Sequence, residues 1–509
     1  MAALAPAPRP TTAVGPGLPP DSVAPRRTPA ERRRWLALVS LCIGQLMIVL
    51  DATIVNVALP SIQTSLHFSP ASLAWVVNGY FIAFGGLLLL MGRLGDLVGR
   101  RRVFLSGLAA FSAASLLCGL APTGELLVLA RFAQGMAAAA VSAMVLAILV
   151  TLFPTPRQTA RAMSVYACVA SAGGAIGLLL GGVLTAALSW HWIFFVNLPI
   201  GVAALVLGFA LIPVHVGSGL RHGVDVLGAV LVTAAPSLAI YTILQASENG
   251  WTTMRTLLLG VGAVVLGASF VAVETRVRTP LMPLRVFRSR QVTGANLVRA
   301  LFPVGLFGSL YLGALYLQNV LGYDSLHTGL AFLPQSLAIG TFSMFVTGRL
   351  VARFSAKATL IPGLLLVAAG LALFARMPVG ASYVVDILPV TLLIGIGAGL
   401  VFMPSVALAM AGARPEDTGV ASGLANVSLQ IGAALGVAVL AGVSTGHVRS
   451  LLADGVPARV ALASGYHLAL VVAVGCLLAA TAIGALVLRG APRAAAVALG
   501  RAEVSLGAD

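Results

Sequence analysis

Charged residues are scarce in this sequence of 509 residues. Only 9% of them are Asp, Glu, Lys or Arg, and 59% are hydrophobic, whereas a soluble globular protein carries about 25% charged residues. So few charged side chains could not cover the surface of a water-soluble protein of this length. The sequence therefore excludes a soluble fold and predicts a protein that crosses a membrane many times.

Several chemical groups are also rare or absent. The four cysteines, at positions 42, 118, 168 and 476, each lie in an apolar run and have no metal or redox spacing. The seven histidines are scattered, so we expect no metal site and no cofactor. The sequence contains no G-x-x-x-x-G-K-[ST] motif, and its single lysine, Lys357, is not in such a loop. Hydrolysis of ATP through a P-loop is therefore excluded. A membrane enzyme would need a clustered catalytic set, which the short loops lack, so we expect no enzymatic activity.

Fourteen continuous apolar runs are long enough to span a bilayer, which takes about 20 helical residues. They show no two-residue alternation, so they predict helices and an all-α membrane protein. A proline-rich segment, residues 1–34, precedes them and is expected to be a disordered tail. The approximate limits of the runs are 35–59, 72–91, 103–120, 126–153, 163–188, 192–212, 226–244, 256–273, 292–321, 328–348, 358–374, 383–410, 419–442 and 466–488.

The positive charges predict the orientation of the chain. If the N-terminus is cytoplasmic, the inside segments carry 25 of the 31 Lys and Arg residues and the outside loops carry 4; Arg131 and Arg299 lie within spans. This bias predicts that both termini are cytoplasmic. The net charge of +16 would suggest nucleic acid in a soluble protein. Here the arginines lie in short loops, so we expect contact with the lipid bilayer and none with nucleic acid.

Two motifs occur twice. The segment 92–101 (GRLGDLVGRR) resembles 348–357 (GRLVARFSAK), 256 residues later, and 173–177 (GGAIG) resembles 432–436 (GAALG). Repeated halves are typical of transporters that bind their substrate between the halves. The repeat predicts two six-helix bundles plus two extra central helices. The expected divisions are 1–34, a cytoplasmic tail; 35–212, the N-terminal bundle; 213–291, the extra helices and cytoplasmic linkers; 292–488, the C-terminal bundle; and 489–509, a second cytoplasmic tail.

The stretch 50–60, LDATIVNVALP, places Asp51 inside the first predicted span. A lone ionised carboxylate there costs several kcal/mol or more, so it should be protonated or paired. Arg131, in the fourth span, lies at a similar depth at 1.5 Å per residue. We predict that the two pair, or share a hydrogen-bond network, in one state, and that their separation lets Asp51 take up a proton. This hypothesis requires Asp51 to face a crevice between the bundles. A static structural pair, or a packing Asp, is the alternative.

Other polar and small residues complete the candidate site. In the loop motif, Gly92, Gly95 and Gly99 permit a tight turn, and Asp96, Arg100 and Arg101 supply its charges; the alternative is a simple topological anchor. In the fifth span, Gly173, Gly177 and Gly181 form a GxxxGxxxG face that lets helices approach and slide, although packing alone accounts for it equally well. Candidates for a cavity lining are Gln45, Asn56, Gln134, Asn426 and Gln430.

Together these motifs resemble the fourteen-span drug:proton antiporters of the major facilitator superfamily, the EmrB/QacA type, from about residue 35 to 488. LDATIVNVALP, GRLGDLVGRR, RFAQGMAAA (131–139), GGAIGLLLGG (173–182), WHWIFFVNLPIG (190–201) and DVLG (225–228) carry the resemblance. One residue departs from it, because Leu178 stands where the fifth-span motif usually has proline, which would bend the helix. The second copy of the loop motif also has Ala352 in place of an acid.

The resemblance implies a major facilitator fold and specific roles. Asp51 and Arg131 would serve proton coupling. Asp96 and Arg100 would control a cytoplasmic gate, while Gly173, Gly174, Gly177, Gly181 and Gly182 would pack between the halves. The expected activity is proton-driven efflux of amphiphilic drugs or antibiotics by a monomer in the bacterial cell membrane, with protons as the coupling ion. The alternatives are a dedicated exporter of one self-made metabolite and a proton-coupled uptake carrier.

Overall fold

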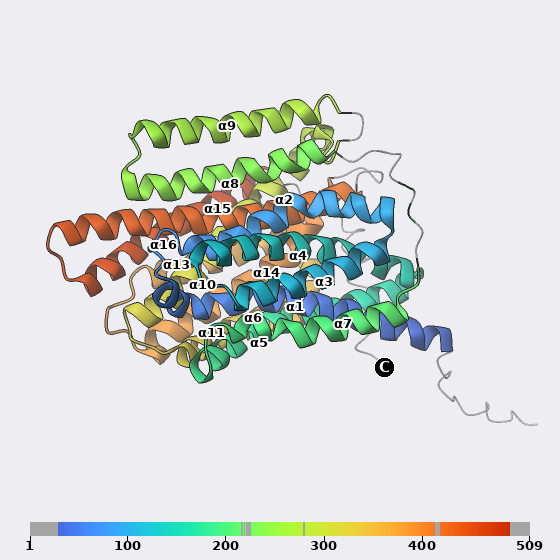
Figure 1. Ribbon diagram of the computed structural model, residues 1–509, viewed down its shortest axis with the longest axis horizontal. Coiled ribbons are helices and arrows are strands. Elements are labelled where there is room, and N and C mark those ends of the chain that lie inside the picture. Colours follow the sequence, from blue (N-terminus) through green and yellow to red (C-terminus); the bar gives the residue numbers. More distant parts are fainter. Residues whose placement is uncertain are drawn as a thin grey trace, which may run out of the picture.

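The structure, a computed structural model, describes residues 29–214, 217, 219, 225–277, 280–412 and 418–488. The predicted tails at 1–28 and 489–509 lie outside these residues. Fourteen helical segments in the described part are long and apolar enough to span a membrane, which confirms the predicted number. They run side by side, as Figure 1 shows.

The helical bounds are α1 (Pro29–Leu66), α2 (Ala74–Val98), α3 (Arg100–Gly119), α4 (Gly124–Leu152), α5 (Pro156–Ala187), α6 (Trp192–Phe195), α7 (Asn197–Leu211), α8 (Val226–Asn249), α9 (Met254–Glu274), η2 (Leu284–Arg288), α10 (Arg290–Asn319), α11 (Ser325–Thr341), η3 (Phe342–Val346), α12 (Thr347–Phe354), α13 (Ala356–Phe374), η4 (Tyr383–Ile387), α14 (Leu388–Ala411), α15 (Thr418–Ala453) and α16 (Ala458–Leu486).

Several helix ends differ from the predicted limits. α1 begins at Pro29 and includes residues 29–34 of the predicted tail; it also passes Pro60, where the sequence predicts its end. A transmembrane helix tolerates a proline because neighbouring helices and local adjustments satisfy the one freed carbonyl. α15 continues 11 residues beyond the predicted limit of 442, to Ala453. At 1.5 Å per residue, its 36 residues extend well beyond the ~30 Å hydrocarbon core. Hydropathy detects only the apolar part of such a helix.

Contacts between the first six spans and the last six follow a symmetric pattern. α5 packs on α11, and α2 packs on α15. The amide of Gln318 on α10 also donates to the carbonyl of Val57 on α1 at 2.8 Å. Two glycines that correspond in the sequence repeat also make corresponding contacts. Gly177 of α5 packs on α1, the first span of its half, and Gly436 of α15 packs on Val304 of α10, the first span of the other half.

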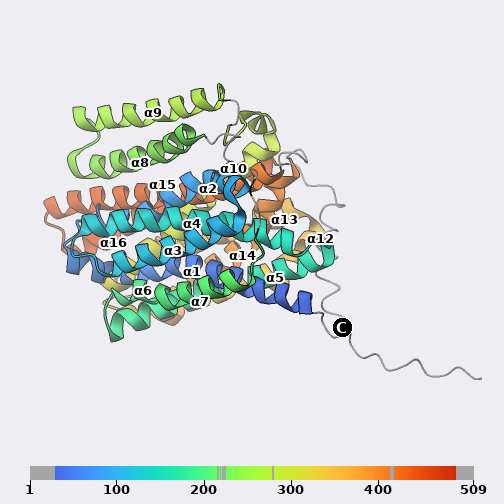
Figure 2. The same cartoon turned by 45° about the vertical axis from the view of Figure 1, so that its right-hand side comes forward.

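The two extra helices are central in the sequence but peripheral in space. α8 and α9 form a hairpin at one side of the bundle, with α9 outermost in both views (Figures 1 and 2). α8 contacts α2 and α15, and α9 packs on α8. Only 6% of the most apolar stretch of α9 is buried, so most of this helix faces the surroundings of the bundle.

The loop motif folds in the same way in both halves. Gly99 joins α2 to α3 with φ +114°, and Ser355, 256 residues later, joins α12 to α13 with φ +121°. A basic side chain two residues after each of these turns donates to a backbone carbonyl near the end of the last span of its half. Arg101 donates to the carbonyl of Phe209 at 2.5 Å, and Lys357 donates to the carbonyl of Leu488 at 2.8 Å. The weak sequence repeat is therefore a structural repeat.

Ser355 is strained at this turn, and this strain gives a testable prediction. Backbone strain in this region of φ destabilises a residue that has a Cβ by about 1–3 kcal/mol. Replacing a serine at a helix N-cap by glycine costs only a few tenths of a kcal/mol of stability. Ser355→Gly should therefore raise the free energy of unfolding by about 1 kcal/mol. Thermal unfolding of the purified protein in detergent measures the change, and Gly99→Ser should shift the midpoint in the opposite direction.

Candidate functional site

The Asp51 carboxylate is fully buried, with an exposed fraction of 0%. Its Oδ2 accepts a hydrogen bond from Nη1 of Arg131 at 2.5 Å. Its Oδ1 accepts from the amides of Gln134 at 2.8 Å and Asn197 at 3.1 Å. The structure therefore brings Asp51 and Arg131 into an ion pair, as the sequence predicts, and surrounds the acid with further donors.

Arg131 has several partners besides Asp51. Its Nε donates to the carbonyl of Val76 on α2 at 2.9 Å, and its Nη1 donates to Oε1 of Gln134 at 2.6 Å. The guanidinium also lies over the ring of Tyr80, 4.5 Å from the centroid. A cation over an aromatic face gains about 2 kcal/mol when desolvated. The arginine is therefore held in place by contacts that do not depend on the carboxylate.

Two members of this network were missed by the sequence analysis. Ser115 on α3 accepts a hydrogen bond from Nε2 of Gln134 at 2.7 Å. Asn197 is the first residue of α7, and the sixth predicted span breaks at Val196 between α6 and α7. Pro199 follows in the first turn of α7, where a helix tolerates proline. A lone Asn inside an apolar run was the available signal.

Asp51 does not face a crevice in this conformation, because its side chain is 0% exposed. Its three side-chain donors, Arg131, Gln134 and Asn197, all belong to the first six spans, and Arg131 itself is only 1% exposed. The expectation that Asp51 faces a crevice between the bundles is therefore wrong for this state. A buried charged pair needs further hydrogen bonds to offset its desolvation, and here Gln134 and Asn197 of the same bundle supply them without water.

The charges of the loop motif contact one another and α4. Nη2 and Nε of Arg100 donate to Oδ1 of Asp96 at 3.0 and 3.2 Å, and Nη1 donates to the carbonyl of Ala147 on α4 at 3.1 Å. Gly95 lies against the side chain of Met144, also on α4, whereas Gly92 has open space around it. The motif thus ties the end of α2 to α4.

The fifth-span glycines divide between two partners. Three of them, Gly173, Gly177 and Gly181, face α1. Gly173 lies against Val49, Gly177 against Leu50 and Thr53, and Gly181 against the carbonyl of Ile54. The prediction that the motif glycines pack between the halves is therefore wrong for these three. Gly182 does meet the other half, at Ser325 and Leu326 of α11, and Gly174 has nothing within 4 Å.

Leu178 does not interrupt the helix, which is α-helical from Pro156 to Ala187. The Leu178 carbonyl lies against Gly329 of α11. A bend is therefore not needed for α5 to contact both α1 and α11.

This close packing beside Asp51 gives a matched pair of predictions. A Cβ at position 177 would lie 2.1 Å from Oγ1 of Thr53 and 2.8 Å from the Leu50 carbonyl, next to Asp51, whereas a Cβ at position 174 would meet nothing. Gly177→Val should destabilise the protein by about 1–3 kcal/mol or more through overpacking. Gly174→Val should destabilise it far less. Thermal unfolding in detergent measures both variants, and equal shifts of the midpoint would contradict this account.

The predicted cavity residues do not gather around one cavity. Gln134 belongs to the Asp51 network, and the amide of Asn56 donates to Ala52 of its own helix at 3.1 Å. Gln45 and Gln430 are buried, and Asn426 is half-buried. A cavity of about 460 Å³ opens elsewhere, between the α8–α9 hairpin and the helices α2, α10, α15 and α16, and none of the five lines it among the described residues.

The second half has a buried cation of its own. Arg299 on α10 is 2% exposed; its Nε donates to the carbonyl of Ala425 and its Nη1 to Oγ of Ser405, both at 2.8 Å. Both of these partners are neutral, whereas Arg131 is paired with an acid. Among the residues that the structure describes, no three His, Cys, Asp or Glu side chains form a group that could hold a metal ion.

The described residues form an all-helical bundle of fourteen spans with a buried acid–arginine pair in its first half. This arrangement is typical of a membrane transporter rather than of a passive scaffold. The sequence model of the Major Facilitator Superfamily matches residues 41–437, so the chain belongs to this superfamily.

Its relatives include proteins of known name. The chain is 41% identical to the puromycin resistance protein pur8 of Streptomyces alboniger, over 93% of this chain and 95% of that protein. It is 38% identical to the cephamycin export protein CmcT of Amycolatopsis lactamdurans, over 81% and 86% of the two chains. Among solved structures, a bacterial homologue of the human lysosomal transporter Spinster, in an inward-facing and unoccupied conformation, aligns with a TM-score of 0.63 at 17% identity, over 94% of this chain and 99% of that one. This likeness concerns the fold.

Proposed function

We propose that this protein is a proton-coupled efflux transporter of antibiotics or other amphiphilic drugs in the bacterial cell membrane, and not an enzyme. Relatives named for puromycin resistance and cephamycin export support the direction of transport. The observation that carries the proposal of proton coupling is the buried ion pair between Asp51 and Arg131. Intramembrane acids of this kind are typical of proton relays.

The proposed coupling follows from the partners of Arg131. The guanidinium favours the charged form of Asp51 while the two groups touch, whereas burial favours the neutral acid. Asp51 is sealed in this conformation, so the proposed cycle needs a shift of α1 relative to α4 that separates the two groups, opens Asp51 to a crevice and lets it bind a proton. Val76, Gln134 and Tyr80 would continue to stabilise the arginine after the separation. The two charge states of Asp51 would then favour different arrangements of the bundle, which is what alternating access requires.

The loop motif is the proposed gate. The Asp96–Arg100 pair and the bond from Arg100 to Ala147 join α2 to α4, and α4 carries Arg131. Breaking these contacts would release the end of α2 at which the arginines cluster. By the distribution of positive charge this end, with both termini, faces the cytoplasm. We propose that the protein works as a monomer of two six-helix bundles, divided at 213–291.

The substrate class follows from the scarcity of acids. Asp51 is deeply buried and already paired, so the site offers little to a dication. We propose neutral or singly cationic amphiphiles as substrates. Tight transport of a doubly charged cation would count against this assignment.

One experiment tests the function as a whole. The purified protein is reconstituted in liposomes with an imposed pH gradient, and movement of puromycin or ethidium against its concentration gradient is measured. We expect transport that depends on the pH gradient and stops when a protonophore is added. Transport that is unaffected by the protonophore would refute proton coupling, and no transport of either compound would refute broad drug efflux.

A dedicated exporter of one self-made metabolite is the second candidate. The similarity to a cephamycin export protein favours it. The two candidates differ in range, because a dedicated exporter should protect cells against one compound in a susceptibility panel and a multidrug exporter against several unrelated ones.

A further inference from the structure

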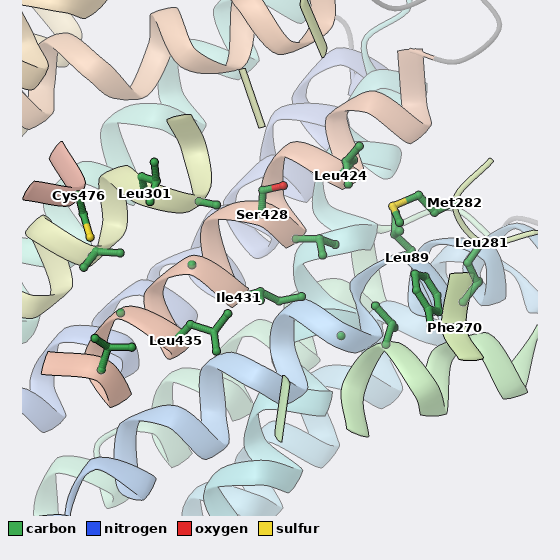
Figure 3. A pocket seen from close by; sticks show the side chains of 18 residues that line it. Leu89, Phe270, Leu281, Met282, Leu301, Leu424, Ser428, Ile431, Leu435 and Cys476 are labelled. Atoms are coloured by element: carbon green, nitrogen blue, oxygen red, sulfur yellow. The ribbon is translucent and has the colours of Figure 1, made fainter. Parts of the chain in front are cut away.

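The cavity beneath the α8–α9 hairpin is a long apolar slot. It follows one face of α15 from Leu424 to Val439, 15 residues along the helix, or about 22 Å at 1.5 Å per residue. Figure 3 shows Leu89, Phe270 and Met282 at one end, and Leu435 and Cys476 toward the other. The slot lies where α2 of the first bundle meets α10 and α15 of the second, and none of its lining residues belongs to the Asp51 network.

The dimensions of the slot fit a single hydrocarbon chain. The cavity volume is about 460 Å³, and its lining runs about 22 Å along α15. An extended hydrocarbon chain fits a space that is this long.

The chemistry of the lining also favours a hydrocarbon chain. Nearly all of the lining side chains are apolar, and the hydroxyl of Ser428 already donates to Oδ1 of Asn296 at 3.0 Å. Sites for drug-like molecules usually add a few convergent polar groups that fix orientation, and this slot offers none. The lining therefore suits the hydrocarbon portion of a ligand, which makes no hydrogen bonds.

One end of the slot leads to a group of exposed arginines. Leu281 and Met282 line the slot, and the backbone N–H of Met282 donates to Oε2 of Glu274 at 3.2 Å, which fixes the loop to the end of α9. The chain then continues directly into η2 and the start of α10, where arginine side chains are exposed at positions 285, 288 and 290. Basic residues at a membrane surface attract anionic headgroups by about 1 kcal/mol each.

We propose that the slot is a binding site for one acyl chain of an anionic phospholipid, with its phosphate headgroup at the arginines of η2 and α10. The α8–α9 hairpin forms the outer wall of this site, which gives the two extra helices a role that a twelve-span bundle would lack. The proposal concerns lipid binding and does not depend on the transported substrate.

Photolabelling in lipid nanodiscs tests the site. The full chain is placed in nanodiscs of phosphatidylcholine with a trace of a phosphatidylglycerol that carries a diazirine midway along one acyl chain, and the labelled peptides are identified by mass spectrometry. We expect labels concentrated on α15 between residues 424 and 439, and competition by unlabelled phosphatidylglycerol but not by phosphatidylcholine. Leu435→Trp should fill the slot and reduce labelling about tenfold. The matched control is Val264→Trp, on the outer face of α9 where Val264 is 73% exposed, and it should label normally.

Headgroup recognition is tested separately. The double substitution Arg288→Gln and Arg290→Gln should reduce the preference for phosphatidylglycerol several-fold, while Arg255→Gln, in the first turn of α9 at its opposite end, should not. Labels spread evenly over the exposed face of α9 would overturn the proposal, as would equal competition by the two lipids. Displacement of the label by puromycin would assign the slot to substrate and also overturn it. The competition in the unaltered protein decides the matter even if Leu435→Trp fails to fold.

Discussion

Replacing Asp51 by asparagine should abolish export driven by a pH gradient while leaving a folded protein in the membrane. Asparagine has nearly the same size and can still accept a hydrogen bond from Gln134 or Asn197, but it cannot exchange a proton. The stability loss should be moderate, because Arg131 keeps its contacts with Val76 and Tyr80. Export of puromycin or ethidium against a gradient should fall to the level of empty liposomes.

The control for this prediction is Asp386→Asn. Asp386 lies in η4, in the first turn of the span that continues into α14. Its Oδ2 accepts a hydrogen bond from the backbone N–H of Ser382 at 2.7 Å. It is partly exposed, so its replacement should leave pH-driven export intact. If Asp51→Asn retained uphill export that a protonophore abolishes, Asp51 would not be the coupling group.

Replacing Arg131 by methionine should destabilise the protein more than any other single substitution discussed above. The change leaves an acid in the bundle interior with only amide donors, Gln134 and Asn197. Removing one partner of a buried ion pair typically costs about 3–5 kcal/mol, because the remaining charge is uncompensated. We expect low yield from the membrane and a clearly lower melting temperature in detergent.

A double variant separates the structural effect from the functional one. Combining Arg131→Met with Asp51→Asn removes both charges, so it should recover much of the lost stability. It should still fail to couple export to a proton gradient. If the double variant melted as low as Arg131→Met alone, the stability loss would come from the lost contacts of Arg131 with Val76 and Tyr80 rather than from the stranded acid.

The sequence predicted the number of spans and the central ion pair for clear physical reasons. Long apolar runs must be helical in a membrane, and two charges at similar depth in neighbouring spans have few other ways to be satisfied. Asp51 and Arg131 therefore meet as predicted. The matched turns at Gly99 and Ser355 likewise follow a repeat that is visible in the sequence.

The sequence could not predict which neighbours enclose these groups. Asn197 joins the site because the sixth span breaks at Val196, and hydropathy does not report such a break. The sealing of Asp51 and the position of the α8–α9 hairpin depend on which helix faces touch, a property of packing rather than of composition. The glycines of α5 likewise indicate close approach but not the partner, which is α1 for three of them and α11 for Gly182.

The confinement of the acid–arginine network to the first six spans has a functional consequence. Arg299 bonds neutral partners, and the second copy of the loop motif has Ala352 in place of an acid. In the proposed mechanism, the groups that would bind and release the proton all lie in the first six spans. Variants substituted only in the last six spans should therefore keep transport that depends on a pH gradient, even where their substrate range changes.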